Sequence, residues 1–174
     1  MKQKKTFNSI LVVLMVCFLS QNIFGQESNS LENLMDRAEI IIIGTVAEIN
    51  SQWNKDKTSI LTFVKINIEE NIKGNNAKKE ITVRVLGGEV EEIRMHVSNS
   101  PEFKVGERYL CFLQKDTDNT FAITGWEAGK FISENGYWTN KTSKISYAKI
   151  VELKEKFKTI DNTTLIKTHN NGNY

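Results

Sequence analysis

Residues 39–46 read Glu-Ile-Ile-Ile-Ile-Gly-Thr-Val, and this stretch decides how the chain folds. Its four consecutive isoleucines are β-branched, and they favour a strand that is buried on both faces. Gly44 interrupts the apolar run, and a glycine inside a strand indicates a bend or a bulge. A strand of this kind is what the wall of a small β-barrel needs in order to curl.

Further short strands follow this one at close spacing. The apolar residues from 60 to 68 alternate with more polar neighbours, which predicts a long strand with one buried face. Gly87-Gly88 predicts a two-residue hairpin turn that leads into a strand with Ile93 inward and Arg94 and His96 outward. Other short strands are predicted at residues 81–85, 108–113, 121–126 and 129–132. The pattern indicates a mainly β domain, a sandwich or a barrel.

Helical patterns flank these strands. Asn29 and Glu32 have the spacing of a capping box at the start of a short amphipathic helix. From Ser146, apolar residues recur on one helical face as far as Phe157. Residues 26–158 are therefore expected to form a single domain with a helix near each end, and residues 159–174, rich in Asn and Thr, to form a disordered tail.

Residues 1–25 have the form of a secretory signal peptide, with a basic start followed by an apolar stretch that ends at Gly25. The protein is therefore expected to be exported, either to the periplasm or out of the cell. The apolar core from Ile10 to Leu19 is shorter than the roughly 20 residues of a spanning helix, so no membrane span is expected after signal removal. Lipidation at Cys17 is the alternative, although Leu14-Met15-Val16 lacks the small residues expected before a lipidated cysteine.

Charge and cysteine content exclude several classes of function. The chain has 23 basic and 21 acidic residues, so its charges nearly balance. A nucleic-acid partner requires a concentrated basic face, and none is therefore expected. Once Cys17 is removed with the leader, Cys111 cannot form an internal disulfide. It lies between Leu110 and Phe112 in an apolar run, which favours a buried thiol over a nucleophile.

No group of residues in the sequence specifies a reaction. The two histidines, His96 and His169, lie in different segments, so neither a metal site nor a cofactor is predicted. Ser146 and Lys149 have the Ser-x-x-Lys spacing of serine acyl-enzymes, but the further motifs that such enzymes need do not fit in the rest of the chain. A helix cap at Ser146 is the simpler interpretation. No catalytic residues are predicted, and the chain is expected not to be an enzyme.

Five residues are candidates for binding. Trp53, Trp126 and its neighbour Glu127 fall at predicted turns or strand ends, where an aromatic face can anchor a partner or stack on a sugar. Trp126 is the best candidate because it alternates away from the apolar residues before it. Arg94 and His96 lie on the polar face of the predicted hairpin. The alternatives are that the tryptophans plug the barrel and that Arg94 and His96 are solvated surface residues.

The order of these segments is similar to that of a known family. Asp36-Arg37-Ala38-Glu39 precedes the isoleucine run, a long strand ends at Lys73-Gly74, and residues 103–110 read Phe-x-x-Gly-Glu-x-Tyr-Leu. From about Leu31 to Phe131 this order resembles the netrin-type module of tissue inhibitors of metalloproteinases, and also exported bacterial proteins of unassigned role. The resemblance implies an OB-like, five-stranded Greek-key β-barrel with a helix packed at its side.

The chain departs from that family in the parts that inhibit proteases. The family's inhibitors hold the target's zinc with an amino-terminal cysteine, whereas the mature chain is expected to begin at Gln26, and the family's disulfides are missing. Protease inhibition through a zinc-binding amino terminus is therefore not expected. The sequence predicts an exported, non-enzymatic binding module whose partner is a protein, such as a protease or an envelope component. A carbohydrate or envelope-polymer binding module is the alternative, and a small hydrolase comes third.

Overall fold

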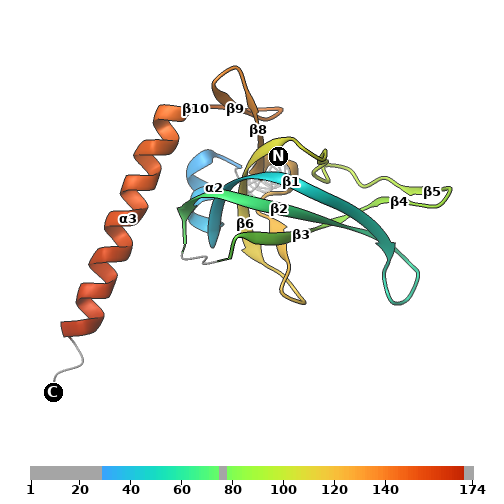
Figure 1. Ribbon diagram of the computed structural model, residues 1–174, viewed down its shortest axis with the longest axis horizontal. Coiled ribbons are helices and arrows are strands. Elements are labelled where there is room, and N and C mark those ends of the chain that lie inside the picture. The colour runs from blue at the N-terminus through green and yellow to red at the C-terminus, as the bar shows by residue number, and fades with distance from the viewer. Residues whose placement is uncertain (1–28, 75–77, 171–174) are drawn as a thin grey trace, which may run out of the picture.

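Figure 1 shows the computed structural model of the chain, which describes residues 29–74 and 78–170, with side chains as far as Ile160. The expected signal peptide, Cys17 and the expected mature end at Gln26 lie outside the described residues. No helix in the described part is long and apolar enough to cross a membrane.

Five strands close into a barrel: β1 (Ile40–Trp53), β2 (Ile60–Lys73), β3 (Glu80–Leu86), β6 (Arg108–Lys115) and β7 (Phe121–Ile123). Their order around the barrel is β1-β2-β3-β7-β6, and β6 pairs back onto β1. The β3–β7 pairing is parallel and the others are antiparallel. The fold is therefore mainly β, with an OB-like Greek-key barrel, as the sequence predicted.

Other strands extend this barrel. β8 (Lys130–Glu134), β9 (Tyr137–Thr139) and β10 (Lys144–Ser146) continue the sheet beyond β6. A one-turn 3-10 helix, η2 (Trp126–Gly129), leads into β8. β4 (Gly88–Val90) and β5 (Ile93–Met95) form a separate two-stranded ribbon, which extends away from the barrel in Figure 1.

Two α-helices complete the part of the fold that the structure describes, α2 (Leu31–Arg37) and α3 (Tyr147–Asn170). The Asn33 backbone N–H donates to Ser30 Oγ at 3.2 Å, so the cap of α2 is Ser30, one residue after the predicted Asn29. Ser146 caps α3 as predicted, because its Oγ accepts from the Lys149 N–H at 3.2 Å.

The helix α3 is longer than the sequence pattern indicated. It continues to Asn170, into the segment for which a disordered tail was predicted. No glycine or proline occurs between residues 147 and 170 to end the helix, and the first glycine after its start is Gly172. The remainder of the predicted tail, residues 171–174, lies outside the described residues.

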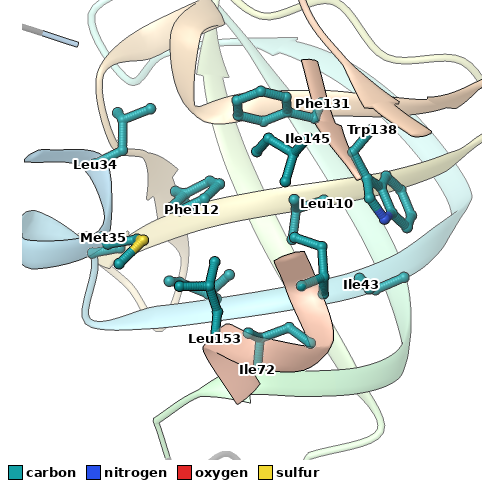
Figure 2. Packing of buried hydrophobic residues seen from close by; sticks show 13 residues of the cluster. Leu34, Met35, Ile43, Ile72, Leu110, Phe112, Phe131, Trp138, Ile145 and Leu153 are labelled. Carbon is teal, nitrogen blue, oxygen red and sulfur yellow. The ribbon is translucent and has the colours of Figure 1, made fainter. Parts of the chain in front are cut away.

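The part of the barrel wall formed by the first half of β1 and by β6 is buried on both faces, as the isoleucine run predicted. Ile42 and Cys111, both 0% exposed, lie among the residues that fill the barrel, here called the lumen core. Ile41 and Phe112, their neighbours in β1 and β6, point the other way. They belong to the outer core, where α2, α3 and β8–β10 pack on the outside of the barrel (Figure 2). Alternation along a strand explains why adjacent residues contribute to different cores.

Gly44 forms the irregularity that the sequence predicted. The register between β1 and β2 shifts between Ile43 and Gly44. A Cβ added to Gly44 would lie 2.4 Å from the backbone oxygen of Asn67, so a side chain could not fit there. The bulge allows β1 to curl around the barrel.

The prediction of a hairpin turn at Gly87-Gly88 was wrong. β3 does not pair with β5, and the turn lies at Glu91 and Glu92, where Glu91 has a φ of 55°. A Cβ on Gly88 would lie 2.2 Å from Thr62 Oγ1, so the glycine pair lets the chain pass closely over β2 before the ribbon begins. Because the ribbon leaves the barrel, Ile93, expected inward, is 53% exposed.

Candidate functional site

Residues 96–103, the first part of the connection from β5 to β6, are the centre of the candidate site. This stretch, called here the 96–103 segment, contributes to the walls of four pockets with volumes of about 390, 330, 350 and 520 Å³. We name the pocket of about 390 Å³ the mouth pocket and that of about 330 Å³ the Trp126 pocket. The pocket of about 350 Å³ is the seam pocket and that of about 520 Å³ is the Lys130 pocket. Three of the five candidate binding residues line more than one of them.

The mouth pocket opens onto the end of the barrel. Its walls include Ile49, Val64 and Val85, which also belong to or pack against the lumen core. Arg94 and His96 lie at its edge, and both are exposed. The Arg94 guanidinium donates to the Glu89 carboxylate at 2.6 and 2.9 Å, so its charge is paired within the ribbon.

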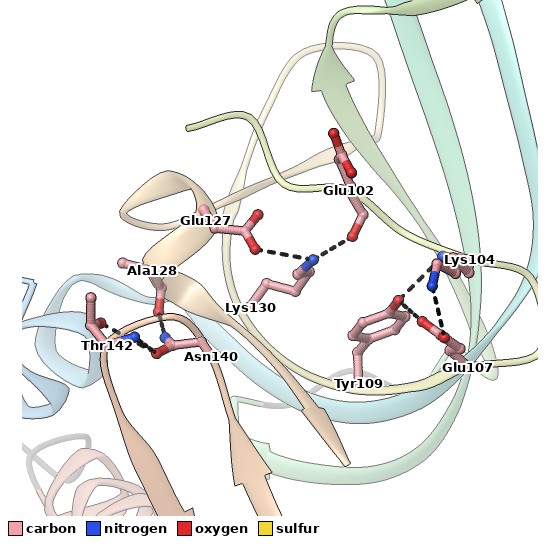
Figure 3. Close-up of polar contacts among 9 residues, drawn as sticks. All are labelled: Glu102, Lys104, Glu107, Tyr109, Glu127, Ala128, Lys130, Asn140 and Thr142. Carbon is pink, nitrogen blue, oxygen red and sulfur yellow. Dashed lines mark hydrogen bonds and ion pairs between the residues drawn. The ribbon is translucent and has the colours of Figure 1, made fainter. Parts of the chain in front are cut away.

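The Lys130 pocket contains a lysine whose side chain is only 10% exposed (Figure 3). Lys130 Nζ lies 3.4 Å from Glu127 Oε1 and donates to the backbone oxygen of Glu102. The same ammonium group lies 5.3 Å from the ring centres of Phe103 and of Tyr109. A carboxylate, a carbonyl and two aromatic faces thus replace the water that a buried ammonium loses.

Tyr109 occupies the other side of this pocket. Its hydroxyl donates to the Glu107 carboxylate and accepts from the Lys104 backbone N–H at 3.2 Å. Burial, reinforced by the bond to Glu107, raises the pKa of Tyr109 well above its ordinary value. The phenol therefore stays protonated, and it ties β6 to the end of the 96–103 segment.

Trp126 is presented to solvent by a strained backbone. It is 50% exposed, and its φ of 57° lies in the left-handed region that bulky residues rarely adopt. The Glu127 N–H donates to the Asn99 oxygen at 3.1 Å. A second bond, from Asn140 Nδ2 to the Ala128 oxygen at 2.8 Å, holds the other end of η2. Trp126 forms part of the wall of both the Trp126 pocket and the seam pocket.

The seam pocket lies where β3 and β7 separate. Arg84 and Asp116 form a two-bond ion pair within it, with both N···O distances 2.7 Å. Their side chains are 31% and 18% exposed, so this pair is partly shielded from water. The rest of the wall is mostly apolar and includes Leu61, Leu86, Pro101, Ile123 and Trp126.

The structure brings four of the five predicted site residues around the 96–103 segment. Arg94 and His96 share the mouth pocket, His96 and Glu127 share the Lys130 pocket, and Glu127 and Trp126 share the Trp126 pocket. Trp53 lies apart, because it pairs with Ile60 at the far end of β1 and lines none of these four pockets.

Sequence reasoning missed Lys130 and the pair of Arg84 with Asp116. Strand alternation could have identified Lys130, because it precedes Ile132 by two residues and so shares the face that turns toward the barrel. The pairing of Arg84 with Asp116 had no local signal, since these residues are 32 positions apart and meet only when the barrel closes.

Within residues 29–74 and 78–170, no cluster of three or more His, Cys, Asp or Glu side chains is arranged to hold a metal ion. No protein-family model matches this chain, and no curated protein matches it. Functional inference therefore depends on the barrel and on the contacts around the 96–103 segment.

Proposed function

We propose that this chain is an exported, non-catalytic binding module, related to the netrin-type modules, that recognises a protein through the surface around Trp126. The partner is a protease or a component of the cell envelope. The closed five-stranded barrel supports the proposed relationship at the level of fold. The observation that carries the functional proposal is the exposed, strained and rigidly held Trp126.

The backbone of Trp126 favours a binding role over a role in folding. A left-handed conformation costs roughly 1–3 kcal/mol and persists only where the surroundings enforce it. Here the bonds to Asn99 and Asn140 enforce it, and the result is an indole half in solvent rather than in either core. A rigid tryptophan loses little entropy on binding, and tryptophan is enriched among the residues that dominate interface energies.

The ionisable groups near this surface support a non-catalytic role. Lys130 is engaged with Glu127, and Tyr109 with Glu107, so each group is held by a neighbour. Ser146 and Lys149, the Ser-x-x-Lys pair of the hydrolase alternative, are engaged as well. Ser146 caps α3, and Lys149 Nζ contacts Glu152 Oε1 at 2.7 Å.

A glycan is the second candidate partner, and the lining of the Trp126 pocket favours it. Asn29, Ser98, Asn99 and Thr142 surround the indole with amide and hydroxyl groups. Such groups can both donate to and accept from sugar hydroxyls, while the indole face stacks on the sugar ring.

Site-specific photo-cross-linking tests the proposal in cells that express the full chain. We would place benzoylphenylalanine at position 126 in one variant and at position 53 in a matched control, because Trp53 is also aromatic but lies away from the four pockets. The expected result is a discrete protein adduct from position 126 only. Trp126→Ala should weaken binding of the identified partner by about 30-fold, the effect of losing an interface anchor worth about 2 kcal/mol.

The outcomes separate the alternatives. Equal adducts from both positions, or no protein adduct from position 126, would contradict the proposal. If envelope polysaccharide shifts the tryptophan fluorescence of the wild-type protein but not of Trp126→Ala, the glycan alternative is favoured. The experiment also reports on export, because the cross-linked chain should be recovered outside the cytoplasm with Gln26 as its first residue.

A further inference from the structure

We infer that the partner binds as an extended strand along the open seam between β3 and β7 and places one large apolar side chain in the seam pocket. This inference rests on the proposed protein-binding function and specifies the kind of segment that is recognised. It is carried by the pairing of the two strands, the direction of the β3 backbone and the chemistry of the pocket.

The barrel is closed at this seam by very little pairing. β3 and β7 share a single register pair, Val83 with Phe121. Beyond it, residues 84–86 of β3 pair only with β2, and residues 122–123 of β7 pair only with β6, among the residues that the structure describes. The two strands therefore separate, and the seam pocket of about 350 Å³ lies over the gap.

The backbone of β3 presents hydrogen-bonding groups to this gap. The Gly87 N–H donates to the Ile60 oxygen of β2 at 2.8 Å. Since backbone groups alternate in direction along a strand, those of Leu86 face away from β2. The Leu86 oxygen accepts from Ser100 Oγ at 2.6 Å, in agreement with that direction. Arg84, two residues earlier, faces the same side, but the Val83–Phe121 bridge uses its N–H to pair with β7. The groups left for a partner are therefore the Arg84 oxygen and the Leu86 N–H.

A strand edge that keeps an open donor and an open acceptor is suited to pairing with another extended chain. Addition of a strand uses main-chain hydrogen bonds for affinity and one or more side-chain pockets for specificity. The seam offers both, because the edge of β3 lies beside a pocket. One residue of an extended chain can donate to the Arg84 oxygen and accept from the Leu86 N–H.

The chemistry of the seam pocket indicates the side chain that it accepts. Arg84 and Asp116 neutralise each other through two bonds of 2.7 Å, so the pocket offers no unpaired charge from either group. Leu61, Leu86 and Pro101 supply apolar surface, and Trp126 closes the end of the pocket near η2. An uncharged, apolar side chain matches this lining, whereas a charged one would lose water without gaining a partner.

A library of random linear peptides of about ten residues, displayed on phage, is the probe for this inference. Wild-type protein should select peptides that carry a large apolar residue and no proline beside it, because proline lacks the N–H that pairing needs. Ala122→Tyr fills the seam pocket, since Ala122 lines that pocket and not the Trp126 pocket. It should weaken binding of the selected peptides at least about tenfold. Gln52→Tyr, an exposed β1 position, is the matched control and should leave binding unchanged.

Hydrogen exchange on the wild-type protein gives a second readout that does not depend on how Ala122→Tyr folds. Bound peptide should slow exchange of the Leu86 amide, which faces the gap without a strand partner in β2 or β7. Exchange of the Asn140 and Thr142 amides, beside the Trp126 pocket, should be unchanged.

Three results would overturn the inference: no selected peptide, equal binding to Ala122→Tyr, or binding without protection at Leu86. None of these would remove the proposed function, because a protein adduct from position 126 tests that separately. Loss of that adduct would instead remove the proposed function itself.

Discussion

At the scale of single residues, Cys111 illustrates how burial limits chemistry. The sequence placed this thiol inside an apolar strand, and the structure places it in the lumen core with no exposed surface. Burial raises the pKa of Cys111 from 9.0 to about 12, and nearby Lys130 only partly opposes this. At neutral pH the group is therefore a protonated thiol with no access to solvent, which suits packing rather than nucleophilic attack.

This shift predicts how stability depends on pH. Because the pKa of Cys111 is higher in the folded chain, the protonated thiol contributes its full stabilisation below pH 9.0 and loses it as the pH rises toward 12. Denaturant unfolding at a series of pH values should show a decline over this range, and Cys111→Ala should show a shallower decline. Tyr109 also has a raised pKa and contributes to both proteins. Parallel curves would contradict the assignment to Cys111.

At the scale of elements, the 96–103 segment has little regular structure of its own, and side chains hold it against the barrel. Ser100 Oγ donates to the Leu86 oxygen, and Lys130 Nζ donates to the Glu102 oxygen. Just beyond the segment, the Lys104 N–H donates to the Tyr109 hydroxyl. The shape of the candidate surface therefore depends on a few polar contacts rather than on a sheet.

Lys130→Met should test this dependence. The substitution leaves the Glu127 carboxylate, which is 17% exposed, without its cation, and it removes the donor to Glu102. The free energy of unfolding should fall by about 3 kcal/mol. Hydrogen exchange in residues 96–103 should become faster.

Lys104→Met is the matched control. Lys104 is 80% exposed and pairs with Glu107 at 3.7 Å, so its loss should cost less than about 1 kcal/mol in the same denaturant titration. Equal losses from the two variants would show that Lys130 does not hold the segment.

At the scale of the whole molecule, one barrel wall separates two cores. Strands β1 and β6 send alternate side chains into the lumen core and the outer core, which gathers α2, α3 and β8–β10. The helices are therefore joined to the barrel through apolar packing on strands that also close it. We expect this arrangement to unfold as one cooperative unit.

Ile41→Ala and Ile42→Ala test that cooperativity from opposite faces of β1. Ile41 is 1% exposed in the outer core and Ile42 is 0% exposed in the lumen core, so each variant should lose about 2–5 kcal/mol. Circular dichroism at strand wavelengths and tryptophan fluorescence, to which Trp138 in the outer core contributes, should give the same transition midpoint. A separate, earlier fluorescence transition in Ile41→Ala would show that the outer core melts alone.

Much of the fold could be predicted from local patterns. The isoleucine run and Gly44 predicted a two-sided, curling strand, and apolar periodicity predicted a mainly β domain with a helix near each end. The choice of a barrel over a sandwich came from the resemblance to the netrin-type module. The turn at Gly87-Gly88 was misread because a glycine pair marks a tight path without indicating whether the strands on either side pair. The end of α3 was misread because a polar composition does not by itself end a helix.

The sequence by itself determined the main barrel strands, the two-sided burial of the isoleucine run and the buried thiol, because side-chain periodicity and β-branching act between near neighbours. Only the tertiary structure decided how Arg94, His96, Trp126 and Glu127 gather around the 96–103 segment while Trp53 stays apart. It also decided the contact of Lys130 with the Glu102 oxygen, the pair of Arg84 with Asp116, and the open seam beside Trp126. These features join residues that lie far apart in the chain, so no local pattern encodes them.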